Sequence, residues 1–246
     1  MRAFYITYPN SSTVLMNTIW QVIYTPPVGE QILRDLLANL EKYINTEDDW
    51  QDPLIKLAII HYQFESIHPF ADGNGRTWRI LMILYLVLKG LLQLPILYLS
   101  EYINTNKTEY YNVLQWVRTN WDWDSLVHYI IVAVDQQAIK TKDKLEAITN
   151  LIKEKKQQID DLKLKIPWTF IDYFFDRPYC SIVMIEKDKK YTRKTIKKHI
   201  DLLVNKWILK ILKSDYEIPY YIPEYIDILF WHIKNKEKII KFTHSL

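Results

Sequence analysis

Residues 68–79 read HPFADGNGRTWR and lie between two apolar helical stretches. The segment combines one histidine, one carboxylate, a Gly-Asn-Gly run and two arginines. A Gly-Asn-Gly run lets successive backbone N–H groups point into one concavity, which can bind an anion. A helix that begins near Arg76 would add the positive end of its dipole at the same place. The segment therefore predicts a phosphate-handling loop between two helices.

The polar side chains of this segment suit the same chemistry. Asp72 is a candidate Mg²⁺ ligand, because a lone carboxylate beside phosphate oxygens commonly holds this ion. Arg76 and Arg79 lie three residues apart on one helical face and can clamp phosphates. His68 ends the preceding helix and is a candidate general base. Taken alone, a histidine at a helix end is usually a capping or surface residue, and Asp-Gly-Asn-Gly is a common turn.

These residues resemble the signature of the Fic family, H-x-F-x-(D or E)-G-N-G-R-x-x-R, and every fixed position agrees. The resemblance extends over residues 15–135, with further similar segments at 22–28, 60–67, 97–103 and 110–118. It implies a mainly α fold, a Fic-type helical bundle with a short β-hairpin flap, followed by a small winged-helix domain.

The resemblance also implies an activity, the transfer of AMP from ATP to a Ser, Thr or Tyr hydroxyl of a target protein. It gives His68 the role of general base and Asp72 that of Mg²⁺ ligand. With Asp72, the residues that it implies for ATP binding are Gly73, Asn74, Gly75, Arg76, Thr77, Arg79 and Tyr110. ATP and Mg²⁺ are the expected cofactors, and the Asn74 side chain is expected to assist at the phosphates.

The strand-like run Trp20–Tyr24 resembles the family's flap, along which a target protein docks its backbone by β-augmentation. Its ordinary alternative is an edge strand. Self-modification is a further option. Members of this architecture usually carry an N-terminal inhibitory pattern, (S or T)-x-x-x-E-(G or N), whose glutamate pairs with the second motif arginine, here Arg79. No such pattern precedes residue 68. A shortened chain, a separate inhibitory chain and an unrestrained protein all remain open, and shortening predicts exposed apolar surface near Leu33 and Leu37.

Two residues near the motif keep two interpretations each. Tyr110 lies in a segment that resembles the nucleotide-lining part of the family, but aromatic residues on amphipathic helices are often core. Trp78 occupies a variable motif position, where an indole could crowd the phosphate site or fill the pocket mouth. His61 is expected to be structural. The histidines elsewhere lack metal-ligand spacing, so no zinc site is predicted.

Apolar spacing and turn residues predict the remaining elements. The expected helices cover 30–44, 52–67, 77–89, 109–118, 125–140, 143–165, 168–175, 181–187 and 193–206. Strands at 208–212 and 220–222 are expected to pair. The resulting organisation is a Fic catalytic domain over 1–140, an exposed connecting helix over 141–165 and a winged helix-turn-helix domain over 166–246.

The C-terminal domain suggests a different function, DNA binding by a transcriptional regulator with a weakened or inactive Fic core. Residues 186–213 contain ten Lys or Arg against three Asp or Glu. Residues 191–213 could seat a recognition helix in the major groove, with Lys194, Lys197 and Lys198 at phosphates. Protein contacts and a merely solvated lysine face are the alternatives. A degenerate enzyme blocked by Trp78 is a third hypothesis.

Composition limits which other classes of protein the chain can belong to. The chain has 246 residues, 49% of them hydrophobic, and a net charge of only +3, so no global field dictates a polyanionic partner. The unbroken apolar run Ile80–Leu88 is far shorter than the ~20 residues that a membrane span needs. No membrane association is therefore expected. The single cysteine, Cys180, cannot form an internal disulfide, which fits a cytoplasmic protein.

Overall fold

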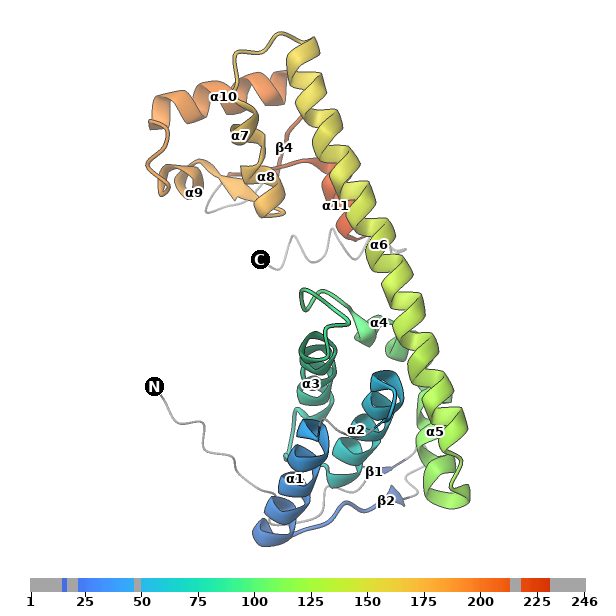
Figure 1. Cartoon of the computed structure of the whole chain (residues 1–246). Coiled ribbons are helices and arrows are strands. Elements are labelled where there is room, and N and C mark those ends of the chain that lie inside the picture. The colour runs from blue at the N-terminus through green and yellow to red at the C-terminus, as the bar shows by residue number, and fades with distance from the viewer. Residues whose placement is uncertain (1–14, 17–21, 47–49, 213–217, 231–246) are drawn as a thin grey trace. The chain divides into compact units, whose positions relative to one another are not determined.

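A computed structural model describes residues 15–16, 22–46, 50–212 and 218–230 (Figure 1). The fold is mainly α, as predicted. The chain divides into two compact units, Met1–Thr141 and Lys142–Leu246. The division falls inside one long helix, α6 (Trp123–Asp161), so each unit contains part of it.

The first unit is a helical bundle with one short strand pair. Its helices are α1 (Glu30–Asn45), α2 (Pro53–Ile67), α3 (Asn74–Leu88), α4 (Leu99–Thr105), α5 (Lys107–Asn120) and the first part of α6. The predicted helices over 30–44 and 52–67 are confirmed to within one residue. The prediction missed α4, a short helix that follows the Pro95 loop. The strands β1 (Leu15–Met16) and β2 (Val22–Tyr24) pair antiparallel.

Helix α2 is the element that positions the motif. It begins where predicted, because the Asp52 side chain accepts a hydrogen bond from Leu54 N at 2.8 Å and Pro53 occupies the first turn. Helix α2 packs against both α1 and α3. Leu57 and Ile60 are fully buried in the core of this unit. A helix held on two sides in this way gives its C-terminal end, at His68, a fixed position.

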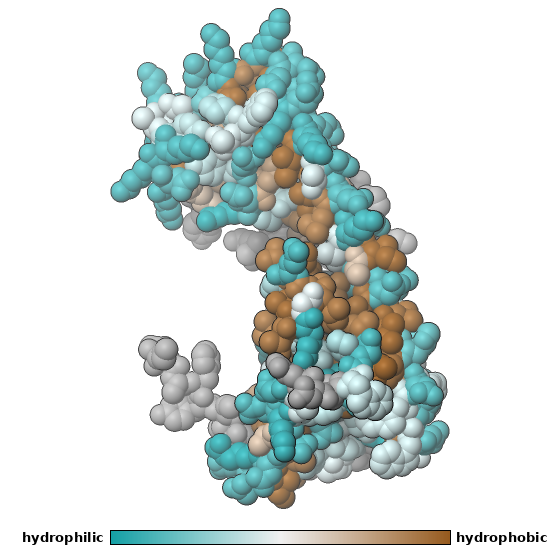
Figure 2. All heavy atoms as spheres, viewed as in Figure 1, coloured by the Kyte–Doolittle hydropathy of each residue, from teal (hydrophilic) through white to brown (hydrophobic). Residues whose placement is uncertain are grey.

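Apolar surface is exposed at two places in the first unit. Leu33 is fully buried and Leu37 packs against the core, but Ile32 beside them is 53% exposed, so some exposed apolar surface lies near the predicted place. More exposed apolar side chains follow one face of α3, at Ile80, Leu84 and Leu88. Figure 2 shows hydrophobic surface in brown over α3 and the loop after it. Among the described helices, none is long and apolar enough to cross a bilayer.

The second unit combines short helices with a small sheet. After α6 it contains α7 (Trp168–Ile171), α8 (Tyr173–Asp176), β3 (Cys180–Ser181), α9 (Ile182–Glu186), α10 (Arg193–Asn205), β4 (Lys210–Ile211), β5 (Pro219–Tyr221) and α11 (Pro223–Leu229). The sheet order is β3-β5-β4, with both pairs antiparallel. The predicted pairing of the last two strands is confirmed. The predicted helix over 168–175 is instead two short helices, and the prediction missed β3 and α11.

Helix α6 differs from the two separate helices that the sequence predicted. It is continuous, and the part assigned to an exposed connector contributes to the core of the second unit. Leu151 and Ile159 are buried there. Lys155 is also buried, and its ammonium group lies 2.7 Å from Glu224 Oε1 on α11. The description of this segment as exposed is therefore wrong.

Candidate active site

His68 stands at the point where α2 turns into the motif loop. Its backbone has the left-handed conformation, with φ 47° and ψ 56°, and its N–H donates to Phe64 O at 3.0 Å. This conformation is uncommon for a residue with a side chain and ends the helix abruptly. The Nδ1 atom of the imidazole is buried. The second ring nitrogen, Nε2, is therefore the one available to a substrate.

Asn74 closes the loop from the other end. Its Oδ1 accepts from Phe70 N at 3.0 Å, and its Nδ2 donates to Phe70 O at 2.6 Å. The Asn74 side chain is buried, and Phe70 packs against the core. Both polar groups of the amide are thus engaged by the protein. The structure gives this side chain a role in shaping the loop, and its assistance at the phosphates stays a prediction.

Helix α3 begins at Asn74, earlier than the predicted start at Thr77, so the glycine-rich run is itself the first helical turn. Gly73 precedes it with φ 90°, a conformation that favours glycine. The N–H groups of Arg76 and Thr77 both donate to Gly73 O, at 3.0 and 2.9 Å, and the Thr77 hydroxyl donates to the same oxygen at 3.1 Å. The N–H groups of Asn74 and Gly75 belong to the helical turn that has no intrahelical acceptors. This end of the helix is suited to an anion.

The charged motif residues surround this helix start. Asp72 Oδ2 lies 3.1 Å from Arg76 Nη2, and both side chains are mostly exposed. An exposed pair of this kind adds little stability, so each partner is free to exchange it for a ligand. Arg79 lies one turn further along α3, with its guanidinium 5.5 Å from the Trp78 ring. A Cβ on Gly75 would come within 3.3 Å of Arg79 Nη1. Glycine at this position therefore leaves room for the Arg79 guanidinium.

A buried carboxyl group, Glu65, lies behind His68. Glu65 Oε2 is 4.0 Å from His68 Nδ1. Burial raises the pKa of Glu65 to about 7, against the opposing charges of Arg79 and Arg118 and a hydrogen bond from Trp78. Burial likewise lowers the pKa of His68; the charge of Arg118 adds to this, whereas the backbone of Glu65 opposes it. His68 is therefore neutral at physiological pH, as a general base must be.

Aromatic residues fill the core beside the site. Trp78 is 2% exposed, with its ring 4.1 Å from that of His61 and 6.3 Å from that of Tyr110. Of the two interpretations of this indole, filling of the pocket mouth does not fit its burial, and crowding of the phosphate site stays a prediction. Tyr110 is 5% exposed, which favours its packing interpretation over nucleotide contact. His61 is fully buried, and burial followed by the charge of Arg79 lowers its pKa to about 3, as suits a neutral structural residue.

Strand β2 is anchored to the same helix end. The Tyr24 hydroxyl donates to Ser66 O at 2.7 Å, and the Arg118 guanidinium lies 4.0 Å from the Tyr24 ring centroid. The paired strand that the flap hypothesis requires is therefore present over Val22–Tyr24 and ends close to His68 in the fold. Trp20 lies outside the described residues. Docking of a target along this strand stays a prediction.

The described residues contain no group of three or more His, Cys, Asp or Glu that could hold a metal ion. Magnesium needs no such group when substrate phosphates and waters supply most of its ligands. The exposed carboxylate of Asp72, beside a helix start suited to phosphate, fits this kind of site.

The comparison with known protein families agrees with this geometry. The Fic/DOC family profile matches residues 10–86, which include the whole motif loop and most of α3. The chain carries a Fic-family domain. Its matched region contains His68, Asp72 and both motif arginines.

Similar proteins are known for this region. Protein adenylyltransferase fic-1 of Caenorhabditis briggsae is 40% identical over 68 residues, covering 27% of this chain and 13% of that protein. Protein adenylyltransferase Fic of Culex quinquefasciatus is 40% identical over 65 residues, covering 26% and 13%. A solved Fic family protein from Desulfovibrio desulfuricans G20 is 19% identical, with a TM-score of 0.47 over 87% of this chain and 62% of that chain. The match thus spans only 13% of each of the two curated relatives.

Sequence reasoning missed two residues of the Fic domain's site, Glu65 and Arg118. Glu65 Oε2 lies 4.0 Å from the buried Nδ1 of His68, and the charge of Arg118 lowers the pKa of His68. For Glu65 a signal was available, since it is a carboxylate on an apolar helix one turn before the motif histidine. For Arg118 no local pattern exists, because α5 reaches the site only through the tertiary fold.

Asn74→Ala is expected to destabilise the Fic domain by about 2 kcal/mol, because it removes two hydrogen bonds and leaves backbone groups of Phe70 without partners. Urea denaturation measures the change. Asn45→Ala is the matched control, since the Asn45 amide makes one exposed hydrogen bond, to Glu41 O. Equal effects of the two substitutions would contradict the structural role of Asn74.

Glu65→Gln is expected to alter how stability depends on pH. The folded state raises the pKa of Glu65 from 4.5 to about 7, so it holds this proton more tightly than the unfolded chain. The resulting stabilisation is complete below pH 4.5 and is lost as the pH rises through 7. Compared with wild type, the variant should therefore gain about 1–3 kcal/mol between pH 4.5 and 8. Urea unfolding at several pH values tests this, and parallel profiles for the two proteins would contradict it.

Proposed function

We propose that this chain is a protein adenylyltransferase, which transfers AMP from ATP to a Ser, Thr or Tyr hydroxyl of a target protein. One observation carries the proposal: a neutral histidine and an anion-suited helix start stand at opposite ends of one loop closed by Asn74. The names of the curated relatives support this reaction for the matched region. For the chain as a whole, both the AMP transfer and the protein target are proposals.

In the proposed reaction, Nε2 of His68 takes the proton from the target hydroxyl. The hydroxyl oxygen then forms a bond to the α-phosphorus of ATP, and the bond from that phosphorus to the bridging oxygen breaks. AMP remains on the target, and pyrophosphate leaves. Such transfers depend mostly on positioning and on charge stabilisation.

The remaining motif residues supply that positioning. The N–H groups of the first turn of α3 bind phosphate oxygens, and Arg76 and Arg79 hold the β- and γ-phosphates. Asp72 would hold Mg²⁺, which would supply positive charge to the phosphates. The pair between Arg76 and Asp72 is exposed, so both side chains can exchange it for other partners. Strand β2 offers backbone groups to an extended target segment.

A labelling experiment tests this function. The protein is incubated with cell lysate, Mg²⁺ and ATP that carries label at either the α- or the γ-phosphate. We expect protein labelling from α-labelled ATP alone and a gain of one AMP in the intact mass of the target. Asp72→Asn should lower labelling and raise the Mg²⁺ requirement. Labelling from γ-labelled ATP alone, or no labelling with either, would reject AMP transfer.

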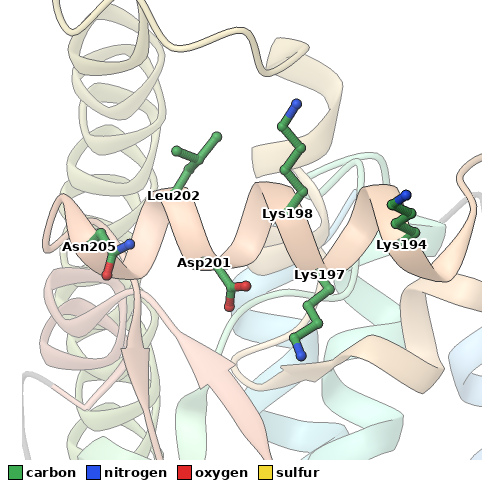
Figure 3. A pocket seen from close by; sticks show the side chains of 6 residues that line it. All are labelled: Lys194, Lys197, Lys198, Asp201, Leu202 and Asn205. Atoms are coloured by element: carbon green, nitrogen blue, oxygen red, sulfur yellow. The ribbon is translucent and has the colours of Figure 1, made fainter.

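DNA binding by the second unit is a second candidate function, and a surface hollow favours it. The hollow has a volume of about 360 Å³ and lies along α10 (Figure 3). Its lining residues are Lys194, Lys197, Lys198, Asp201, Leu202 and Asn205. Helix α10 follows α9 after a short turn, the order expected of a recognition helix. The three lysines are exposed and suit phosphate contacts.

A gel shift with genomic DNA at several salt concentrations tests this candidate. Each lost phosphate contact should lower the slope of log affinity against log salt by about 0.9. A variant with Lys194→Gln, Lys197→Gln and Lys198→Gln should therefore bind more weakly and with a flatter slope. Lys153→Gln on α6 is the control, because this lysine is also exposed but lies outside the hollow. The absence of any shift at low salt would remove DNA binding.

A further inference from the structure

Glu65 occupies an unusual place for a carboxylate. It lies on α2, one turn before His68, and only 9% of it is exposed. Helices α3 and α5 also face it. The titratable and charged groups that act on it are His68, Arg79, Tyr110 and Arg118, and the Trp78 indole also favours its charged form. A carboxyl group is costly to bury unless charges or hydrogen bonds compensate.

Two of the groups that act on Glu65, His68 and Arg79, belong to the motif itself. Glu65 Oε2 lies 4.0 Å from Nδ1 of His68, the ring nitrogen that faces the interior. The charge of Arg79 also acts on the same carboxyl group. Glu65 therefore interacts with both the residue proposed to accept the proton and a residue proposed to hold phosphate. No other carboxylate of the described residues lies within 4.0 Å of the His68 imidazole.

We propose that Glu65 is a positioning residue, whose carboxyl group couples the imidazole of His68 to the guanidinium of Arg79 from the buried side of the site. The catalytic meaning of this coupling rests on the proposed transferase function. A carboxylate behind the inner nitrogen favours a proton on Nδ1, which leaves Nε2 as the basic atom. It also stabilises the imidazolium that forms when Nε2 accepts the substrate proton, by the logic of an acid–histidine pair in a catalytic triad.

The coupling has a direct consequence for titration. Burial places the ionisation of the Glu65 carboxyl near pH 7, whereas burial moves the ionisation of His68 below its usual range. Because the two groups are close, each should register the other's change of charge. In the wild-type protein the His68 ring resonances should therefore show an inflection near pH 7 that comes from Glu65, in addition to their own.

Nuclear magnetic resonance of the nucleotide-free protein tests the coupling without any assay of activity. We expect the Glu65 side-chain carboxyl carbon and the His68 ring nitrogens to share the inflection near pH 7 in wild type. Glu65→Gln should remove this inflection from His68. Glu30→Gln is the matched control, because Glu30 forms an exposed pair with Arg34 and should leave the His68 curve unchanged. If the Glu65→Gln variant fails to fold, the wild-type titration still tests the coupling. Without an inflection that the Glu65 carboxyl carbon and the His68 ring nitrogens share, the proposal is overturned.

Kinetics then separate a positioning role from a purely structural one. With α-labelled ATP, Glu65→Gln should lower kcat about tenfold or more and flatten its rise with pH between 6 and 8. Glu65→Asp, which keeps the charge but shortens the side chain, should restore part of the pH dependence. Identical His68 titration curves in wild type and Glu65→Gln would overturn the proposal. A shared inflection in a protein that transfers no AMP would uphold the coupling and reject only the transferase function.

Discussion

Replacing His68 by alanine is expected to lower the rate of AMP transfer by about 10²–10⁴-fold, the usual contribution of a positioned general base. The fold should persist, because His68 lies at the end of α2 and its backbone hydrogen bond to Phe64 O does not need the side chain. The left-handed backbone of this residue is somewhat less favourable for alanine, so we expect a loss of no more than about 1 kcal/mol. Labelling with α-labelled ATP and urea unfolding measure the two effects.

His68→Asn separates catalysis from stability more sharply. Asparagine adopts the left-handed conformation more readily than alanine does, so this variant should be at least as stable as His68→Ala. It nevertheless lacks a base and should be as inactive. ATP binding by both variants should stay close to wild type, because the phosphate contacts belong to α3. Transfer that survives in either variant would show that another group accepts the proton.

The motif loop was predictable because its chemistry is local. Gly73 is required by its own backbone angle, and the arginine pair follows from helical spacing. A linear pattern therefore indicates the helix start and the charges around it. The same reasoning did not find the hydrogen bonds of the Asn74 side chain to Phe70, because these depend on how the loop folds back on itself.

Features that depend on the tertiary fold were not accessible in this way. Arg118 is distant in sequence and reaches the site through the packing of α5, and the burial of Glu65 depends on what α3 and α5 place around it. The continuity of α6 was missed because its polar residues indicated a solvated connector, whereas Leu151 and Ile159 are covered by the second unit's own core. In each of these cases the role of a residue depends on what the tertiary fold packs around it more than on its residue type.

Trp78→Ala is expected to have the largest effect on stability, a loss of about 3–5 kcal/mol. The Trp78 side chain is 2% exposed, and its ring packs 4.1 Å from that of His61. Alanine would leave a large cavity in the core beside the site. Urea denaturation should show a lower midpoint. Trp50→Ala is the matched control, because Trp50 is 96% exposed and its loss should change stability by less than about 0.5 kcal/mol.

The same variant tests whether the indole obstructs the phosphate site. Because Trp78 packs inside the core, its removal frees no space at the mouth of the site and loosens the support of Glu65 and Arg79. ATP affinity should therefore stay equal or fall in Trp78→Ala, measured by calorimetry at a temperature where the variant is folded. A rise in affinity would restore the interpretation in which tryptophan at this motif position blocks the nucleotide. A stability loss no greater than that of Trp50→Ala would show that the ring is not the core residue described here.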